Sequence, residues 1–320
     1  MSGAFVISLD FELMWGVRDH RSVAEYGDAV LGGREAIPLI LSRFREARIW
    51  ATWATVGLLF ARNRTEMLDH APALRPDYRD ATLSPYSAIE TGVIGEDEQA
   101  DPLHFGSSLL ERIAETEGQE IATHTYSHYY CLEPGADVAS FEADLASAVA
   151  IARETGHSLQ SIVFPRNQIS EEFVAAGAGL GVTTYRGNAT GWLYRARSGG
   201  ETTMPFRLAR FIDGALPIGP AQVVHPEHHG PACNVPASRF LRPWSAKLAA
   251  YHELHIRRIE SEMELAARRG GCYHLWWHPH NFGRNTARNL AQLDRVIACF
   301  KRCRDDFGME SRTMRDLALS

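Results

Sequence analysis

Short apolar runs alternate with amphipathic stretches along most of the chain. The apolar runs predict strands at residues 4–9, 49–55, 120–122, 161–164, 182–185 and 272–276. Apolar positions at helical spacing predict helices at residues 33–48, 103–117, 137–155, 171–178, 244–269 and 287–304. Strands that alternate with helices indicate βαβ units and a parallel sheet. The pattern amounts to six or seven such units, which fits a closed or nearly closed barrel, with a doubly wound open sheet as the alternative.

Two stretches interrupt this alternation. Residues 64–102 are polar and contain several prolines, and residues 187–243 have no regular periodicity. Six prolines fall between Pro217 and Pro243. We therefore expect a single domain over residues 1–320, with insertions at about 64–102 and 187–243.

Composition and charge narrow the class of protein. Hydrophobic residues make up 45% and charged residues 22%, which is typical of a globular chain and excludes a disordered, collagen-like or coiled-coil protein. The net charge is −6 and no basic stripe offsets it, which argues against nucleic-acid binding. The five cysteines contain no CxxC pair, so neither a disulfide framework nor a thiolate zinc site is indicated. The first residues lack the features of a signal peptide and no apolar run approaches about 18 residues, which predicts a cytoplasmic protein without a membrane span.

Unusual polar residues cluster where the predicted strands end. In a parallel α/β protein the carboxyl ends of the strands form one face, and active sites lie on that face. Five clusters occupy this position, which is hard to attribute to chance. The clusters are Asp10 with Glu12, His124 with His128, Arg166 with Asn167, Arg186 alone, and His278 with His280.

The run His124-Thr-Tyr-Ser-His128 holds two histidines four residues apart. On a helical turn both project to the same side, which suits two ligands of one divalent metal. The run is not the metalloprotease motif HExxH, because Thr125 stands where the glutamate would be. A structural pair of histidines is the alternative.

Asp10 and Glu12 are two residues apart at the end of the first strand, and such positions share one face of a strand. One carboxylate with two histidines completes a catalytic metal site that keeps one position open for water. The other carboxylate is then available as a base. The alternative is that both are strand-exit charges that reach solvent.

Two further side chains fit such a site. Arg166 can pair with a carboxylate and keep it ionised, although an ordinary surface arginine is the alternative. His278 can act as a general acid, because imidazole titrates near neutrality. A histidine that only bonds a backbone carbonyl is the alternative there.

Together these motifs resemble the NodB-homology polysaccharide deacetylases, the carbohydrate esterase family four type, over roughly residues 4–285. The run from His124 to His128 fits the H-[S/T]-x-x-H motif of that family in full. The resemblance implies a distorted (β/α)7 barrel and one divalent metal that serves to remove N- or O-acyl groups from sugars. Zinc is expected, with cobalt or nickel as alternatives.

The resemblance also implies roles for individual residues. Glu12, His124 and His128 are expected to bind the metal, with Asp10 as the base. The family usually has two adjacent aspartates, but the spaced acid pair here occurs in divergent members. The remaining expectations are that Arg166 orients Asp10, that His278 is the acid with His280 as the alternative, and that the substrate contacts Trp53, Asn167, Arg186 and His280.

A cytoplasmic deacetylase of this kind is expected to remove an acetyl or formyl group from an amino sugar, free or linked to a nucleotide or lipid, during assembly of a surface polysaccharide such as lipopolysaccharide. The alternatives are an allantoinase-like hydrolase of a cyclic amide and a carbohydrate-binding protein without activity. The oligomeric state stays open. Trp192, Arg195 and Arg197 are candidates for sugar stacking or phosphate contact, or are exposed loop residues. A second metal site at His225–His229 is also considered, although an exposed loop tip is favoured there.

Overall fold

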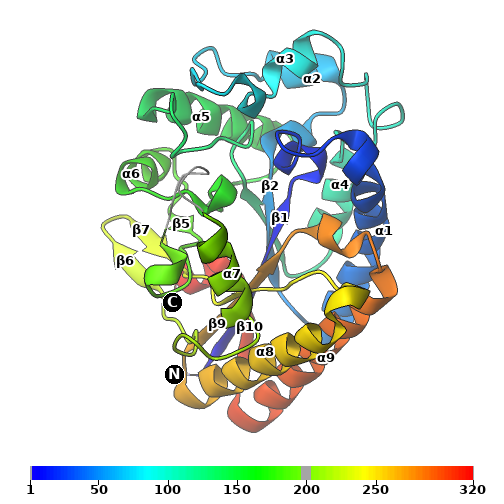
Figure 1. Cartoon of the computed structure of the whole chain (residues 1–320). Coiled ribbons are helices and arrows are strands. Elements are labelled where there is room, and N and C mark those ends of the chain that lie inside the picture. The colour runs from blue at the N-terminus through cyan, green and yellow to red at the C-terminus, as the bar shows by residue number, and fades with distance from the viewer. Residues whose placement is uncertain (1, 196–202, 320) are drawn as a thin grey trace.

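A curled sheet of parallel strands surrounded by helices forms the fold (Figure 1). The structure is a computed structural model that describes residues 2–195 and 203–319. The strands are β1 (Ala4–Phe11), β2 (Ala51–Thr55), β3 (Gln119–Thr123), β4 (Ser161–Ile162), β5 (Thr184–Tyr185), β6 (Glu227–His229), β7 (Ala232–Asn234), β8 (Arg239–Phe240), β9 (Cys272–Trp277) and β10 (Glu310–Arg312). The helices are α1 (Val23–Ala47), α2 (Arg64–Asp69), α3 (Tyr86–Glu90), α4 (Ser107–Glu115), α5 (Val138–Glu154), α6 (Glu171–Gly179), α7 (Met204–Asp213), α8 (Ala249–Arg269), α9 (Thr286–Phe307) and α10 (Met314–Ala318).

Strand β1 is the centre of the sheet. It pairs in parallel with β2 on one side and β9 on the other, and β3, β4 and β5 follow beyond β2 in chain order. Its apolar run Phe5-Val-Ile is fully buried, as expected for a parallel strand covered on both faces. The carboxyl ends of these strands therefore lie on one face, as the sequence pattern predicts.

One bent segment closes the barrel. Strand β7 pairs in parallel with β5, and β8, which follows five residues later, pairs in parallel with β9. Backbone bonds from Ala237 to Gly187 and from Ser238 to His274 connect the two halves. With β7 and β8 counted as one position, the barrel order is β1, β2, β3, β4, β5, β7/β8 and β9. The predicted (β/α)7 barrel is confirmed, and the open doubly wound sheet is excluded.

The stretch 187–243, which we expected as an insertion, thus contains a barrel strand. The strand is broken into pieces of three and two residues, and Pro236 lies between them. These short pieces have no periodicity for a sequence pattern to reveal. The described part of 64–102 contains α2 and α3, which lie at the top of Figure 1.

Local signals explain where the helices begin and end. Helix α1 begins well before the predicted Gly33, because Ser22 and Glu25 form a capping box. Helix α5 begins after Asp137, whose carboxylate accepts a hydrogen bond from the Ser140 amide at 2.8 Å, as predicted. Helix α8 ends at Gly270 in the left-handed conformation. In the described part of the chain, no helix has the length and apolar character needed to cross a membrane.

Candidate metal and catalytic site

Three buried ligand-type atoms meet where β1 and β3 end. Glu12 Oε2 lies 3.3 Å from His124 Nε2 and 3.1 Å from His128 Nε2. The other nitrogen of His124 donates to the Val163 carbonyl at 2.7 Å, which directs Nε2 toward Glu12. Burial alone raises the pKa of Glu12, but the charge of His278 and hydrogen bonds from the two histidines hold it well below its ordinary value. A carboxylate with two imidazoles is a donor set that divalent zinc accepts.

The histidine loop is not the helical turn that the spacing predicts. Thr125 and His128 both have left-handed backbone angles, with φ of 63° and 61°. The Asp144 carboxylate on α5 accepts hydrogen bonds from the Tyr126 amide at 2.7 Å, from the Ser127 amide and from the Ser127 hydroxyl. These bonds replace the missing helical bonds and still bring the two histidine rings to a centroid distance of 4.9 Å.

Asp144 is a buried carboxylate that contacts the histidine loop, and it is absent from the residues expected in the site. Its burial raises its pKa to about 6, despite the three hydrogen bonds that favour the ionised form. The available signal was a carboxylate on the mostly apolar buried face of α5, between Phe141 and Ala148. Buried carboxylates are costly unless hydrogen-bonded, so this position indicated a partner.

Arg186 and Asp10 form a buried ion pair inside the barrel. Arg186 Nη1 lies 2.7 Å from Asp10 Oδ1, and Nη2 lies 2.8 Å from Oδ2. The same guanidinium donates to Ser8 Oγ and to Asn167 Oδ1, each at 3.0 Å. Burial alone raises the pKa of Asp10, but the charges of Arg186, His124 and His278 outweigh it and hold that pKa below its ordinary value. Asp10 is therefore an ionised carboxylate in a fixed orientation.

The prediction that Arg166 orients Asp10 is wrong. Arg166 forms ion pairs with Asp19 and Glu133, and its side chain is partly exposed. The backbone at Arg166 is left-handed, with φ of 54°, directly after Pro165. This turn carries the side chain away from β1, so Arg186, expected as a substrate contact, occupies the position beside Asp10.

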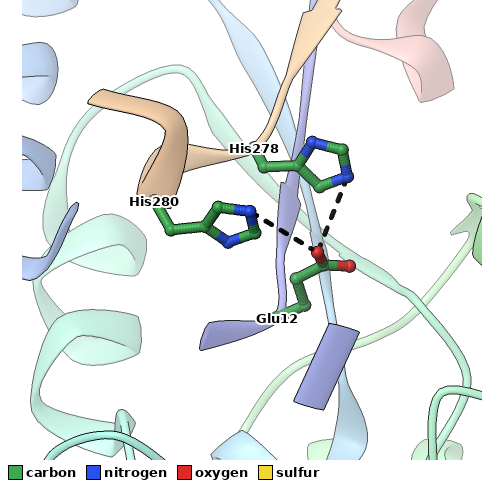
Figure 2. A group of neighbouring side chains, drawn as sticks. All are labelled: Glu12, His278 and His280. Atoms are coloured by element: carbon green, nitrogen blue, oxygen red, sulfur yellow. Dashed lines mark ion pairs between the residues drawn. The ribbon is translucent and has the colours of Figure 1, made fainter. Parts of the chain in front are cut away.

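His278 and His280 approach the Glu12 carboxylate from the end of β9 (Figure 2). His278 Nε2 lies 3.6 Å from Asp10 Oδ2 and 3.6 Å from Glu12 Oε1. His280 Nε2 lies 3.9 Å from Glu12 Oε1, and the two imidazole rings stack at 5.0 Å. The His278 side chain is 24% exposed, whereas that of His280 is buried. Burial lowers the pKa of His280 to about 3, so this ring is neutral near pH 7.

Trp53 does not line this site. It is fully buried and its indole nitrogen donates to Gln119 Oε1 at 2.9 Å. Strand side chains alternate between two faces, and Trp53 pairs with Leu9 while Ala54 pairs with Asp10. Trp53 therefore belongs to the core outside the barrel, and its assignment as a substrate contact is wrong.

The remaining candidates fall in different places. The structure brings metal-ligand side chains together in two groups of three among the described residues, and both contain Glu12. The second group consists of Glu12, His278 and His280, and neither group includes His225–His229, whose last two histidines are exposed. Trp192 is exposed, Arg195 lines a cavity beside His278, and Arg197 lies outside the described residues.

Comparisons with known proteins establish the fold. No protein-family model matches the chain, and no similar sequence is found among curated proteins. A Mycobacterium smegmatis structure described as a polysaccharide deacetylase matches with a TM-score of 0.61 and 15% identity, over 99% of this chain and 90% of that one. A Pseudomonas aeruginosa PAO1 structure with the same description matches with a TM-score of 0.58 and 11% identity, over 99% of this chain and 89% of that one. The Puue allantoinase structure matches with a TM-score of 0.55 and 12% identity, over 99% of this chain and 89% of that one. The chain therefore has the NodB-type (β/α) barrel fold of the polysaccharide deacetylases.

Proposed function

We propose that the protein is a divalent-metal-dependent hydrolase that removes an N-acyl group, acetyl or formyl, from an amino sugar or from a nucleotide- or lipid-linked sugar. The observation that carries the proposal is the meeting of two carboxylates and three histidines at the strand ends. Glu12 lies within 3.3 Å of the His124 and His128 nitrogens, and His278 lies 3.6 Å from both Glu12 and Asp10. The fold of the polysaccharide deacetylases supports the same reaction class by analogy.

Glu12, His124 and His128 would hold the metal. Their Nε2 and carboxylate atoms are buried together, and the low pKa of Glu12 provides the ionised ligand that a metal needs. Zinc suits this donor set, and cobalt or nickel are alternatives. Such an ion, when bound, lowers the pKa of water towards about 7 and polarises an acyl carbonyl.

Asp10 is the proposed base. Its ionised carboxylate can accept a proton from a water that attacks the acyl carbon, and the bidentate contact with Arg186 fixes the direction of both oxygens. Because Arg186 lowers the pKa of Asp10, the base remains ionised at neutral pH. Arg186 is therefore a positioning residue that acts through Asp10.

His278 is the proposed acid. It faces both carboxylates and is the histidine of the pair that is open to a substrate, whereas His280 is buried and neutral. In its protonated form His278 can donate to the nitrogen that leaves when the amide bond breaks. His280 stacks on the His278 ring and is proposed to support its orientation.

A cyclic-amide hydrolase is the second candidate. The observation that favours it is the fold shared with the Puue allantoinase, at a TM-score of 0.55. The same base, acid and ligand set could open a ring amide without releasing a carboxylic acid. The cavity of about 270 Å³ beside His278 favours a larger, sugar-like substrate, since it extends the site beyond the reacting groups.

The test is the metal content of purified protein together with acetate and formate release from UDP-linked N-acyl sugars. We compare wild type with the double variant His124→Ala/His128→Ala. The matched control is His228→Ala/His229→Ala, which removes two exposed histidines far from Glu12 in sequence. One bound metal and acyl release, both lost in the first variant and kept in the control, support the proposal.

Other outcomes contradict it. Metal retained without acyl release, but with ring opening of a cyclic amide, favours the second candidate. Failure to bind zinc, cobalt or nickel at all overturns the metal site and leaves a carbohydrate-binding protein.

A further inference from the structure

A cavity of about 270 Å³ opens beside His278, between the loop after β5 and the segment that contains β8. Part of its wall is aromatic. Phe240 and Trp276 lie with ring centroids 4.7 Å apart, and each lies close to His278, at 5.8 and 5.7 Å. Both rings are partly exposed, so they present an apolar surface to whatever enters the cavity. Hydrophobic and aromatic side chains of this kind predominate in sites that bind small molecules.

The charges that line this cavity are positive, although the whole chain carries −6. No aspartate or glutamate is among the described residues that line it. Five arginines do: Arg166, Arg195, Arg210, Arg239 and Arg242. A concave site lined by one sign of charge attracts a ligand of the opposite sign.

Some of these charges are already balanced. Arg239 is buried, with Nη1 2.6 Å from Asp213 Oδ2 and Nη2 2.8 Å from Glu262 Oε1. Arg166 forms ion pairs with Asp19 and Glu133. These arginines shape the cavity but have little attraction left for a ligand.

Arg242 differs from them. In the part of the chain that the structure describes, no carboxylate lies within 4.0 Å of its guanidinium. The group instead lies near two aromatic rings, with Cζ at 5.1 Å from the centroid of Phe211 and 5.9 Å from that of Phe240. One of its donors contacts the Tyr251 side chain. No carboxylate takes the others, so they remain available to an anion. Asn167 adds a neutral donor, since its oxygen accepts from Arg186 and its amide nitrogen has no partner among the described residues.

One aromatic ring of the cavity wall lies close to both the proposed acid and Arg242. The Phe240 centroid is 5.8 Å from that of the His278 imidazole and 5.9 Å from the guanidinium carbon of Arg242. A single ring that packs on Phe240 would therefore lie near both the proposed acid and Arg242.

We propose that Arg242 binds a phosphate group of the substrate, so that the protein acts on an acylated amino sugar that carries a phosphate on the ring, as in a nucleoside-diphosphate sugar or a lipid-linked sugar phosphate. This inference rests on the proposed deacylase function for the identity of the sugar. Arginine suits the role, because its planar guanidinium can donate two parallel hydrogen bonds to a phosphate. The aromatic wall binds the ring, and the acylamino group faces His278.

The test is binding, measured by calorimetry on the metal-loaded protein with N-acetylglucosamine, N-acetylglucosamine 1-phosphate and UDP-N-acetylglucosamine. We expect the two phosphorylated ligands to bind roughly tenfold to a hundredfold more tightly than the neutral sugar, as charge-assisted hydrogen bonds allow. Arg242→Gln should remove this preference and leave the affinity for the neutral sugar unchanged, and Arg242→Lys should retain part of it. The matched control is Arg257→Gln, because Arg257 is exposed on α8 and pairs with Glu253.

The outcomes separate this inference from the proposed function. Equal affinity for neutral and phosphorylated sugars, or a preference that survives in Arg242→Gln, overturns the phosphate site even if acyl release is observed. A preference that depends on Arg242 supports the phosphate site even if no acyl group is released, in which case the deacylase proposal alone is wrong. Tighter binding of the UDP-sugar than of the 1-phosphate favours a nucleotide-linked substrate. Tighter binding of a short-chain prenyl phosphate sugar favours a lipid-linked one.

Discussion

Arg186 donates to both carboxylate oxygens of Asp10, at 2.7 and 2.8 Å, although β1 and β5 are separated by three strands of the barrel. Both side chains are almost completely buried. An ion pair of this kind costs desolvation energy and is retained only where it serves a purpose or is well satisfied. Ser8 accepts from the same Nη1 and Asn167 from the same Nη2, so the pair holds one geometry and keeps Asp10 ionised next to the proposed metal ligands. Among the described residues, only the buried Nε of this guanidinium lacks a partner.

Removing either partner should therefore destabilise the fold, because it leaves the other charge buried and unpaired. Arg186→Gln leaves a buried carboxylate without its charge partner, and we expect a loss of about 3–5 kcal/mol in the free energy of unfolding. Asp10→Asn leaves the buried guanidinium without its counter-charge and turns one acceptor into a donor that faces Arg186. We expect a similar loss of about 3–5 kcal/mol in the free energy of unfolding, while kcat falls roughly 10²–10⁴-fold. The double variant should regain stability relative to Arg186→Gln without regaining activity. Urea unfolding and acyl-release kinetics measure the two effects separately.

Arg166→Gln is the matched control for this series, because Arg166 follows a neighbouring strand but pairs with Asp19 and Glu133. We expect kcat to stay within about tenfold of wild type, because the ion pairs of Arg166 are with Asp19 and Glu133 rather than with Asp10 or Glu12. An activity loss equal to that of Arg186→Gln would show that Arg166 acts on Asp10 after all.

The sequence predicts the part of the site that depends only on the order and direction of the strands. Parallel strands end on one face, so Asp10, His124 and His278 had to lie near one another once the strands were recognised. That argument does not decide whether Arg166 or Arg186 pairs with Asp10. Both follow strands at the same face, and only the left-handed turn at Arg166 decides which guanidinium reaches Asp10.

The fold, like the site, has parts that the sequence predicts and parts that it does not. Long, strongly patterned elements such as α8 and β9 were predicted within a few residues, because their periodicity is sustained. The closing strand was missed, since β7 and β8 are three and two residues long and are stabilised by pairing with β5 and β9 rather than by local propensity. Trp53 was misplaced for another reason: a strand motif gives residue identity, but the face is set by register.

Asp144 is predicted to control metal affinity without touching the metal. Its carboxylate accepts hydrogen bonds from the Tyr126 and Ser127 amides and so fixes the left-handed loop that carries His128. Asp144→Ala leaves these buried amides without an acceptor, and we expect roughly 10–100-fold weaker zinc binding. Competition with a chromogenic chelator measures the affinity.

The control for Asp144→Ala is Asp137→Asn on the same helix. Asp137 is the N-cap of α5, and asparagine caps as well as aspartate does, so zinc affinity and stability should both be close to wild type. If Asp144→Ala binds zinc with wild-type affinity, the loop is fixed by other contacts and Asp144 has no positioning role.

His278 and His280 should be separable by kinetics. His278→Gln removes the proposed acid, so kcat should fall roughly 10²–10⁴-fold with little change in KM. His280→Gln should have the smaller effect, because His280 is buried and neutral and its Nε2 lies farther from Glu12 Oε1 than that of His278, at 3.9 Å against 3.6 Å. Steady-state kinetics with an N-formyl and an N-acetyl substrate tests both variants, and the reverse order of effects would transfer the acid role to His280.

His255 should make stability depend on pH independently of catalysis. Its Nδ1 donates to the Gly214 carbonyl at 2.7 Å and its Nε2 accepts from the Arg242 amide at 3.4 Å, so both nitrogens are used by the neutral ring. Burial, together with the charges of Arg242 and Arg239, lowers its pKa from 6.5 to about 4. The unfolded chain therefore binds a proton below about pH 6.5, whereas the folded protein does so only near pH 4.

The sign of the effect follows from this difference. The contribution of His255 is fully present above about pH 6.5 and is lost as the pH falls to 4, with a total of about 3 kcal/mol at roughly 1.4 kcal/mol per pH unit. His255→Asn keeps a donor for Gly214 but cannot titrate. In urea unfolding, the stability difference between wild type and this variant should narrow between pH 7 and pH 4.5, whereas Asn188→Ala in the same cavity should show a constant difference. If the stability difference between wild type and His255→Asn does not narrow at low pH, the folded protein accommodates the charged ring beside Arg242, contrary to the contacts described.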